Sequence, residues 1–146
     1  MPTREEIYRR VTACLVGALN VDEADVRPAS TLEGDLGAES IDFLDIVFRL
    51  EREFDIRIPR DELFPESIFG GDPEFVQDGR VTPRGLEELR GRMPFAELTE
   101  FEKDPQVGRI GDLFTVQLIA RYVQGKLEAD RRNGVAAAAG PRIAAR

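Results

Sequence analysis

The sequence has 146 residues, a formal net charge of −8 at pH 7 and no histidine. This length suits one ordinary domain with a real hydrophobic core. The acidic balance argues against nucleic acid as a partner, because phosphates demand a basic surface, and it favours protein partners that are basic. The absence of histidine excludes Ser-His-Asp and Cys-His catalysis and most zinc sites.

Two further features suggest the cellular compartment of the protein. No apolar run approaches the roughly 18 residues that span a bilayer, and the N-terminus lacks a signal-peptide pattern. The chain has a single cysteine, Cys14, which cannot form an internal disulfide. We therefore expect a cytoplasmic protein without membrane insertion.

A first amphipathic helix is predicted over about residues 3–18. Thr3 followed by Glu6 is a capping-box pattern, which marks a helix start. Apolar residues then recur at helical spacing, at Ile7, Val11, Leu15 and Ala18. Cys14 lies beside this line, so we expect a buried packing residue and not a reactive thiol.

Residues 19–39 predict a long loop, because prolines, serines and glycines interrupt any regular period. Four apolar residues favour an ordered loop over a disordered one: Val21, Val26, Leu32 and Leu36. Its acids lack the alternation and the glycine of an EF-hand, so we expect a solvated surface and no metal site.

Ser40 opens a second predicted helix, which runs to about Phe54. A core-facing stripe is formed by Ile46, Val47, Leu50 and Phe54. A second apolar line, displaced around the cylinder, is formed by Ile41, Leu44 and Phe48. The pattern alone leaves two interpretations open: a helix buried on several sides, or a docking face along the second line.

The chain after this helix changes character several times. A short helix is predicted from Arg60 to Phe64, cut by Pro65. Residues 75–82 predict a small hairpin around an Asp78-Gly79 turn. Thr82-Pro83 predicts the start of a further helix with the apolar face Leu86, Leu89 and Met93. Another helical turn or two is predicted at Phe95, Leu98 and Phe101.

The last predicted helix is capped by Asp112. Its apolar face is formed by Leu113, Leu118, Ile119, Tyr122, Val123 and Leu127. Residues 129–146 contain two turn dipeptides and an alanine run with few large apolar residues. We expect this segment to be a flexible tail.

The segment around Ser40 is the most informative in the chain. Taken alone, a serine at a helix start is an N-cap. The N-terminus of a helix also favours a phosphodiester, because its free N–H groups and positive dipole end stabilise an anion. Gly37 and Ala38 would leave the approach to Ser40 open. Read from Gly34 to Pro59, the sequence resembles the prosthetic-group segment of acyl carrier proteins. The resemblance covers about residues 3–63 and 109–128.

The resemblance implies an all-α fold, an acyl-carrier-protein-like four-helix bundle. Residues 1–128 would form a single carrier domain with core 3–68 and 109–128. Residues 69–108, a small hairpin plus short helices, would be an insert between the third and fourth helices. The insert would pack on the bundle as a lid through Phe75, Leu86, Leu89 and Phe101, or it would select partners or enlarge the acyl pocket.

In this family the serine corresponding to Ser40 carries 4'-phosphopantetheine, whose thiol holds an acyl group as a thioester. The resemblance thus implies a carrier and not an enzyme, serving fatty acid, other lipid, polyketide or related biosynthesis. The usual Asp-Ser-Leu is here Glu39-Ser40-Ile41, a conservative departure, whereas Arg49 and Arg52 are unusual in this helix and suggest other partners.

The implied partners are a phosphopantetheinyl transferase and an acyl ligase, synthase or acyltransferase with a basic docking surface. They would contact Glu39, Ile41, Asp42, Leu44, Asp45, Phe48 and Glu51. An aminoacyl carrier with the same arm fits the sequence equally well. The alternative from another class is a non-carrier acidic docking module, in which Ser40 is only a helix cap.

Overall fold

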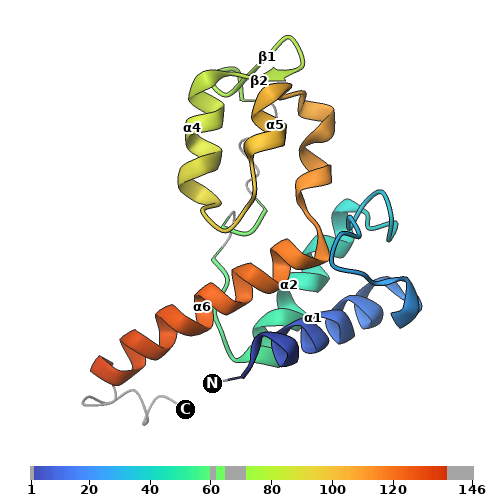
Figure 1. Ribbon diagram of the computed structural model, residues 1–146, viewed down its shortest axis with the longest axis vertical. Coiled ribbons are helices and arrows are strands. Elements are labelled where there is room, and N and C mark those ends of the chain that lie inside the picture. Colours follow the sequence, from blue (N-terminus) through green and yellow to red (C-terminus); the bar gives the residue numbers. More distant parts are fainter. Residues whose placement is uncertain (1, 60–61, 65–71, 138–146) are drawn as a thin grey trace.

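The computed structural model describes residues 2–59, 62–64 and 72–137, with the backbone alone for Ser40 and residues 133–137. Helices make up most of this range, with a single two-stranded sheet, which confirms the expected all-α class. Three long helices pack together: α1 (Arg4–Leu19), α2 (Ser40–Phe54) and α6 (Val116–Ala137). Figure 1 shows that the insert stands on this bundle as a second layer.

Helix α1 begins where the sequence predicts. Thr3 Oγ1 accepts a hydrogen bond from the Glu6 N–H at 3.1 Å, and the Thr3 N–H donates to the Glu6 carboxylate at 3.4 Å. This closes the predicted capping box. The helix packs on both α2 and α6. It buries Ile7, Val11 and Leu15 of the predicted apolar line and Cys14 beside them, whereas Ala18 is half-buried.

Helix α2 has the predicted bounds and the predicted core stripe. Ile46, Leu50 and Phe54 are buried, and Val47 is half-buried. Arg10 of α1 holds the end of this helix, because its Nε donates to the Glu53 carboxylate at 2.6 Å and its guanidinium lies 4.5 Å from the centre of the Phe54 ring.

The chain after α2 is only partly described. Ile56, Ile58 and Leu63 are buried and extend the core beyond the helix. Residues 62–64 form a turn and two bends, whereas residues 60–61 and 65–71 lie outside the described residues, so the short helix predicted from Arg60 to Phe64 stays a prediction. The Tyr122 hydroxyl donates to the Glu62 carboxylate, which fixes this segment to α6.

The insert contains the predicted hairpin and helices. Strands β1 (Val76–Gln77) and β2 (Arg80–Val81) pair antiparallel. Asp78 and Gly79 between them have φ of 54° and 75°, as a tight two-residue hairpin turn requires. Helix α4 (Pro83–Arg92) is capped by Thr82, whose hydroxyl accepts the Gly85 N–H at 3.0 Å. Helix α5 (Thr99–Lys103) follows in the insert, and the 3-10 helix η2 (Val107–Leu113) connects the insert to α6.

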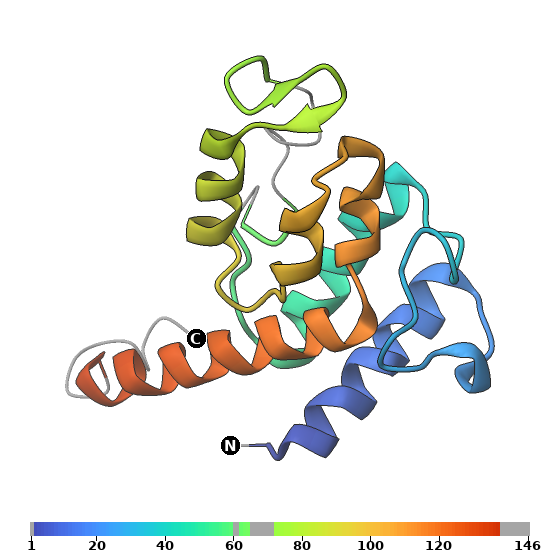
Figure 2. The ribbon, with the colours of Figure 1, turned by 45° about the horizontal axis from the view of Figure 1, so that its top comes forward.

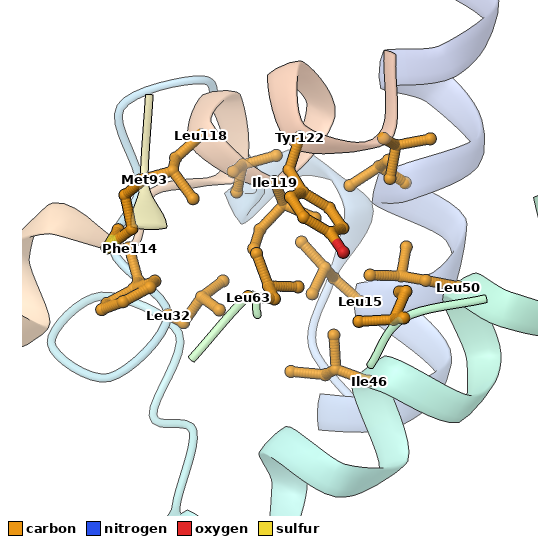
Figure 3. Close-up of a cluster of buried hydrophobic side chains, with 14 of the residues drawn as sticks. Leu15, Leu32, Ile46, Leu50, Leu63, Met93, Phe114, Leu118, Ile119 and Tyr122 are labelled. Atoms are coloured by element: carbon orange, nitrogen blue, oxygen red, sulfur yellow. The ribbon is translucent and has the colours of Figure 1, made fainter. Parts of the chain in front are cut away.

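The insert and the bundle share one hydrophobic core. Met93 is fully buried, and Figure 3 shows it beside Phe114 and Leu118. The Phe95 ring meets the Tyr122 ring of α6 edge-on, with 5.0 Å between centroids. Of the four residues predicted to pack as a lid, Leu89 and Phe101 are buried in this core, and Phe75 and Leu86 are half-buried against it.

The predicted bounds of the last helix are wrong at both ends. Asp112 lies inside η2, and Thr115 is the residue that caps α6, because its hydroxyl accepts the Leu118 N–H at 3.1 Å. The helix then continues to Ala137, so residues 129–137 are helical although they were assigned to the tail. Ala129, Ala136 and Ala137 favour this extension, since alanine has the highest helix propensity. Residues 138–146 lie outside the described residues.

Candidate functional site

The loop before α2 is tied to the start of α6 and to itself. The Leu32 N–H donates to the Phe114 carbonyl at 2.9 Å, and the Ala38 N–H donates to the Leu32 carbonyl at 2.8 Å. The Val116 N–H donates in turn to the Ser30 carbonyl at 3.0 Å. Val26, Leu32 and Leu36 are buried, as an ordered loop requires. Ser40 therefore follows a rigid support.

The last turn of this loop differs from the expectation at one residue. Gly37 has φ of 73°, a left-handed conformation that glycine adopts without strain, and the space where a side chain would project is open. Ala38, which was expected to leave the approach open together with Gly37, is instead buried. The open side of the loop is thus provided by Gly37 alone.

The N-terminus of α2 is capped by Glu39 and not by Ser40. Glu39 has the extended conformation of an N-cap residue, with φ −111° and ψ 169°, and its N–H donates to the Asp42 carboxylate at 2.8 Å. The Ser40 backbone occupies the first helical position. The backbone therefore does not require Ser40 as a cap.

The second apolar line of α2 is exposed. Ile41, Leu44 and Phe48 keep 79%, 61% and 54% of their surface accessible. Among the described residues, these are the large apolar side chains that face solvent. The interpretation that this line is buried on another side is therefore wrong, and an apolar strip runs along α2 from its first turn.

The acids predicted for the same face are placed differently from one another. Glu39 is exposed, whereas Asp42 is half-buried and accepts the Glu39 N–H. Asp45 pairs with Arg49 at 3.0 Å. The Glu51 carboxylate turns toward the chain after the helix and accepts the Ile58 N–H at 2.7 Å. The structure thus places Glu39, Asp42 and Asp45 beside the apolar strip and gives Glu51 a backbone-holding role.

Arg49, one of the two unusual basic residues, has a local role. Besides pairing with Asp45, it lies across α1 at Gly17, where a Cβ would come within 2.6 Å of Arg49 Nη1. Glycine at this position lets the guanidinium cross the helix. Arg52 is exposed.

Cys14 is a packing residue, as predicted. Its side chain is buried, and its Sγ donates to the Arg49 carbonyl at 3.7 Å. Burial, and secondarily the Glu53 charge, raises the pKa of the thiol to about 11. The thiol therefore stays protonated and unreactive near neutral pH.

Two features that support the site were not found from the sequence. Phe43 of α2, Phe64 and Phe114 form a row of rings, with centroids 4.7 Å and 5.1 Å apart, that braces the first turns of α2. The Glu33 carboxylate lies where a side chain at Gly111 would project. The contact brings η2, which connects the insert to α6, to the site loop, as Figures 1 and 2 also show. No local pattern signals contacts between such distant segments.

The residues present fit a covalently attached phosphate group. A serine at the first position of α2 supplies the hydroxyl that a phosphodiester needs, and the helix start offers N–H groups and a positive dipole end. The space beside Gly37 is open. In the described part of the chain, no group of three or more potential metal-ligating side chains is close together. None of the described helices combines the length and apolarity needed to cross a membrane.

A comparison with protein families identifies the segment that carries these features. The model of the phosphopantetheine attachment site matches residues 9–66. The match contains most of α1, the site loop and the whole of α2, and it stops before the insert. Domains of this kind carry 4'-phosphopantetheine covalently and act as carriers. The protein therefore contains a phosphopantetheine attachment domain, which supports a general role as a phosphopantetheine carrier.

Proposed function

We propose that Ser40 carries the 4'-phosphopantetheine arm and that the protein delivers acyl groups, held as thioesters, to biosynthetic enzymes. The observation that supports this proposal best is that Ser40 is the first residue of α2, inside the matched segment, while the neighbouring Glu39 caps the helix. The arm supplies the thiol to which the acyl group is bound. The chain supplies the attachment point and the surface that partners bind, and no catalytic role is proposed for it.

Attachment requires a partner enzyme. A phosphopantetheinyl transferase would bring coenzyme A to the start of α2, and the bond from the Ser40 oxygen to phosphorus would form. The pyrophosphate bond of coenzyme A would break, adenosine bisphosphate would leave, and the transferase would take the hydroxyl proton. Because Leu32 and Ala38 hold the preceding loop by backbone hydrogen bonds, Ser40 is presented at a defined position.

The docking surface is the exposed strip of α2 together with its acids. Ile41, Leu44 and Phe48 would fill apolar sites on the partner, and Glu39, Asp42 and Asp45 would meet basic side chains. Glu51 would belong to the same surface, with its Oε2 also accepting the Ile58 N–H. A contact of this kind is small, fast and salt-sensitive.

Cargo and pathway follow from the loading enzyme, so fatty acid, other lipid and polyketide synthesis all fit this proposal, as does an aminoacyl carrier with the same arm. A cytoplasmic location remains part of the proposal. The competing proposal is an acidic docking module without an arm, in which Ser40 is only a cap. The position of Glu39 as N-cap favours the carrier.

Intact-mass spectrometry tests the proposal. The purified protein would be incubated with coenzyme A, magnesium and a broad-specificity transferase, beside Ser40→Ala. We expect one phosphopantetheine on the unmutated protein, mapped to Ser40 by fragmentation, and none on the variant. No gain with several transferases would leave the docking module as the better proposal.

A further inference from the structure

A groove between the insert and α6 is unused by the proposed attachment site. Its volume is about 150 Å³. Phe95, Leu113 and Leu118 form the apolar part of its lining, and Glu97, Gln117 and Arg121 form most of the polar part. Because Phe95 and Glu97 come from the insert, the groove does not exist in a bundle without it.

The polar lining carries opposite charges that are held apart. The Glu97 carboxylate accepts the Thr99 hydroxyl at 2.6 Å and the Thr99 N–H at 3.2 Å, and these bonds lower the pKa of its carboxyl. Arg121 lies near enough to lower this pKa further, but it makes no ion pair with Glu97 or with any other described residue. Within the described part of the chain, the groove therefore offers one fixed acceptor, Glu97, and one donor without an ion-pair partner, Arg121.

This lining selects the chemistry of a ligand. A free anion would meet Glu97 and the neighbouring Asp112, and a free cation would meet Arg121. A neutral amide chain avoids both conflicts, since its N–H groups can donate to the carboxylate and its carbonyls can accept from the guanidinium. Its aliphatic parts would lie on Phe95 and Leu118. Pantetheine is a chain of this kind, with amides joined by methylene groups.

The end of the groove at Leu113 and Thr115 is within reach of Ser40. Its wall residues Leu113 and Thr115 flank Phe114, whose carbonyl accepts the Leu32 N–H at 2.9 Å. The Leu32 carbonyl accepts the Ala38 N–H at 2.8 Å, and Ser40 follows directly after Glu39. Adding the largest extension of the intervening residues places the Ser40 backbone at most about 16 Å from the Phe114 carbonyl. An extended pantetheine arm is comparable in length.

We propose that this groove binds the amide portion of the prosthetic arm, with Glu97 accepting an amide N–H and Arg121 donating to an amide carbonyl. The inference rests on the proposed function, in which Ser40 carries the arm. It assigns residues of the insert to the resting position of the arm, beside their packing role. Docking of a partner on α2 would then compete for the arm and release it.

Backbone amide NMR of the loaded and unloaded protein tests this inference, with loading verified by intact mass. We expect the amide signals of Thr99, Gln117 and Arg121 to shift on loading. Arg121→Gln should abolish these shifts, whereas Arg132→Gln, an exposed arginine further along α6, should retain them. Arg121 is itself exposed, so the variant is expected to fold, which its circular dichroism spectrum would verify.

The outcomes separate the two proposals. Complete loading without shifts at these three amides would overturn the groove while leaving the carrier function intact. Shifts that persist unchanged in Arg121→Gln would also overturn it, because they would not depend on the groove. If none of several transferases added the mass of phosphopantetheine, the proposed function would be overturned and this inference with it.

Discussion

Replacing Gly85 by alanine tests how closely the insert is packed. A Cβ at Gly85 would press on the Phe75 carbonyl oxygen and lie 2.6 Å from Val81 Cγ1. That carbonyl accepts the Thr82 N–H at 2.8 Å, so moving it disturbs the hydrogen bond that closes the hairpin. Overpacking of this kind costs about 1–3 kcal/mol, and alanine in place of glycine returns about 1 kcal/mol of helix propensity. We expect a net loss of about 0–2 kcal/mol, in contrast to the gain that the propensity alone would give.

Gly125→Ala is the matched control. Gly125 lies in the interior of α6, with no atom near the position of its Cβ, so only the propensity term applies. We expect a gain of about 0.5–1 kcal/mol. Urea unfolding followed by far-UV circular dichroism measures both variants. The packing argument would be refuted if Gly85→Ala were stabilised as much as Gly125→Ala.

Three further predictions concern the site and the core. Leu44→Ala should change the free energy of unfolding by less than about 0.5 kcal/mol, because Leu44 is exposed. The same substitution should slow phosphopantetheine transfer. Equal transfer rates of variant and unmutated protein in a mass-based time course would contradict docking on this strip. Asp45→Lys should slow acyl loading and weaken the salt dependence of loading, because it removes an acid from the docking surface. The control Arg49→Gln also breaks the Asp45–Arg49 pair but keeps the docking charge of Asp45. Loading rates that stay unchanged across a salt titration would contradict this prediction. Burial raises the pKa of Cys14 from 9.0 to about 11. The unfolded thiol therefore loses its proton first, and stability should fall between pH 9 and about 11, less steeply in Cys14→Ala; parallel curves would exclude Cys14 as the cause.

Local signals in the sequence predicted the elements that depend on near neighbours. The Thr3–Glu6 capping box, the Asp78-Gly79 turn and the Thr82 cap each involve residues a few positions apart. The two faces of α2 follow from helical periodicity alone, although the pattern could not say whether the second face was covered. Its exposure depends on where the insert lies, which no local pattern specifies.

Prediction from the sequence fails or stays incomplete where a contact with a distant segment decides the conformation or the partners of a residue. Asp112 is an acceptable helix cap by sequence, but residues 114–116 hydrogen-bond to the loop at residues 30–32, so α6 begins only after Thr115. Glu51 has the predicted spacing of the docking face, but its contact with the Ile58 N–H could not be predicted from the helix alone. The groove combines Glu97 and Arg121, which are close only because the insert folds back on α6.

The way the insert returns to the bundle explains how a carrier domain can hold it without losing its site. The chain re-enters the bundle at Phe114, the same residue whose carbonyl holds Leu32 and whose ring packs at a tilt against that of Phe64. Any displacement of the insert at this point would act on the loop before Ser40 and on the ring row that braces α2. Phe114 thus contributes both to the support of the site and to the attachment of the insert. A free-standing bundle made by deleting residues 70–105 would keep Phe114, and its ability to accept the arm would show whether the bundle alone positions Ser40.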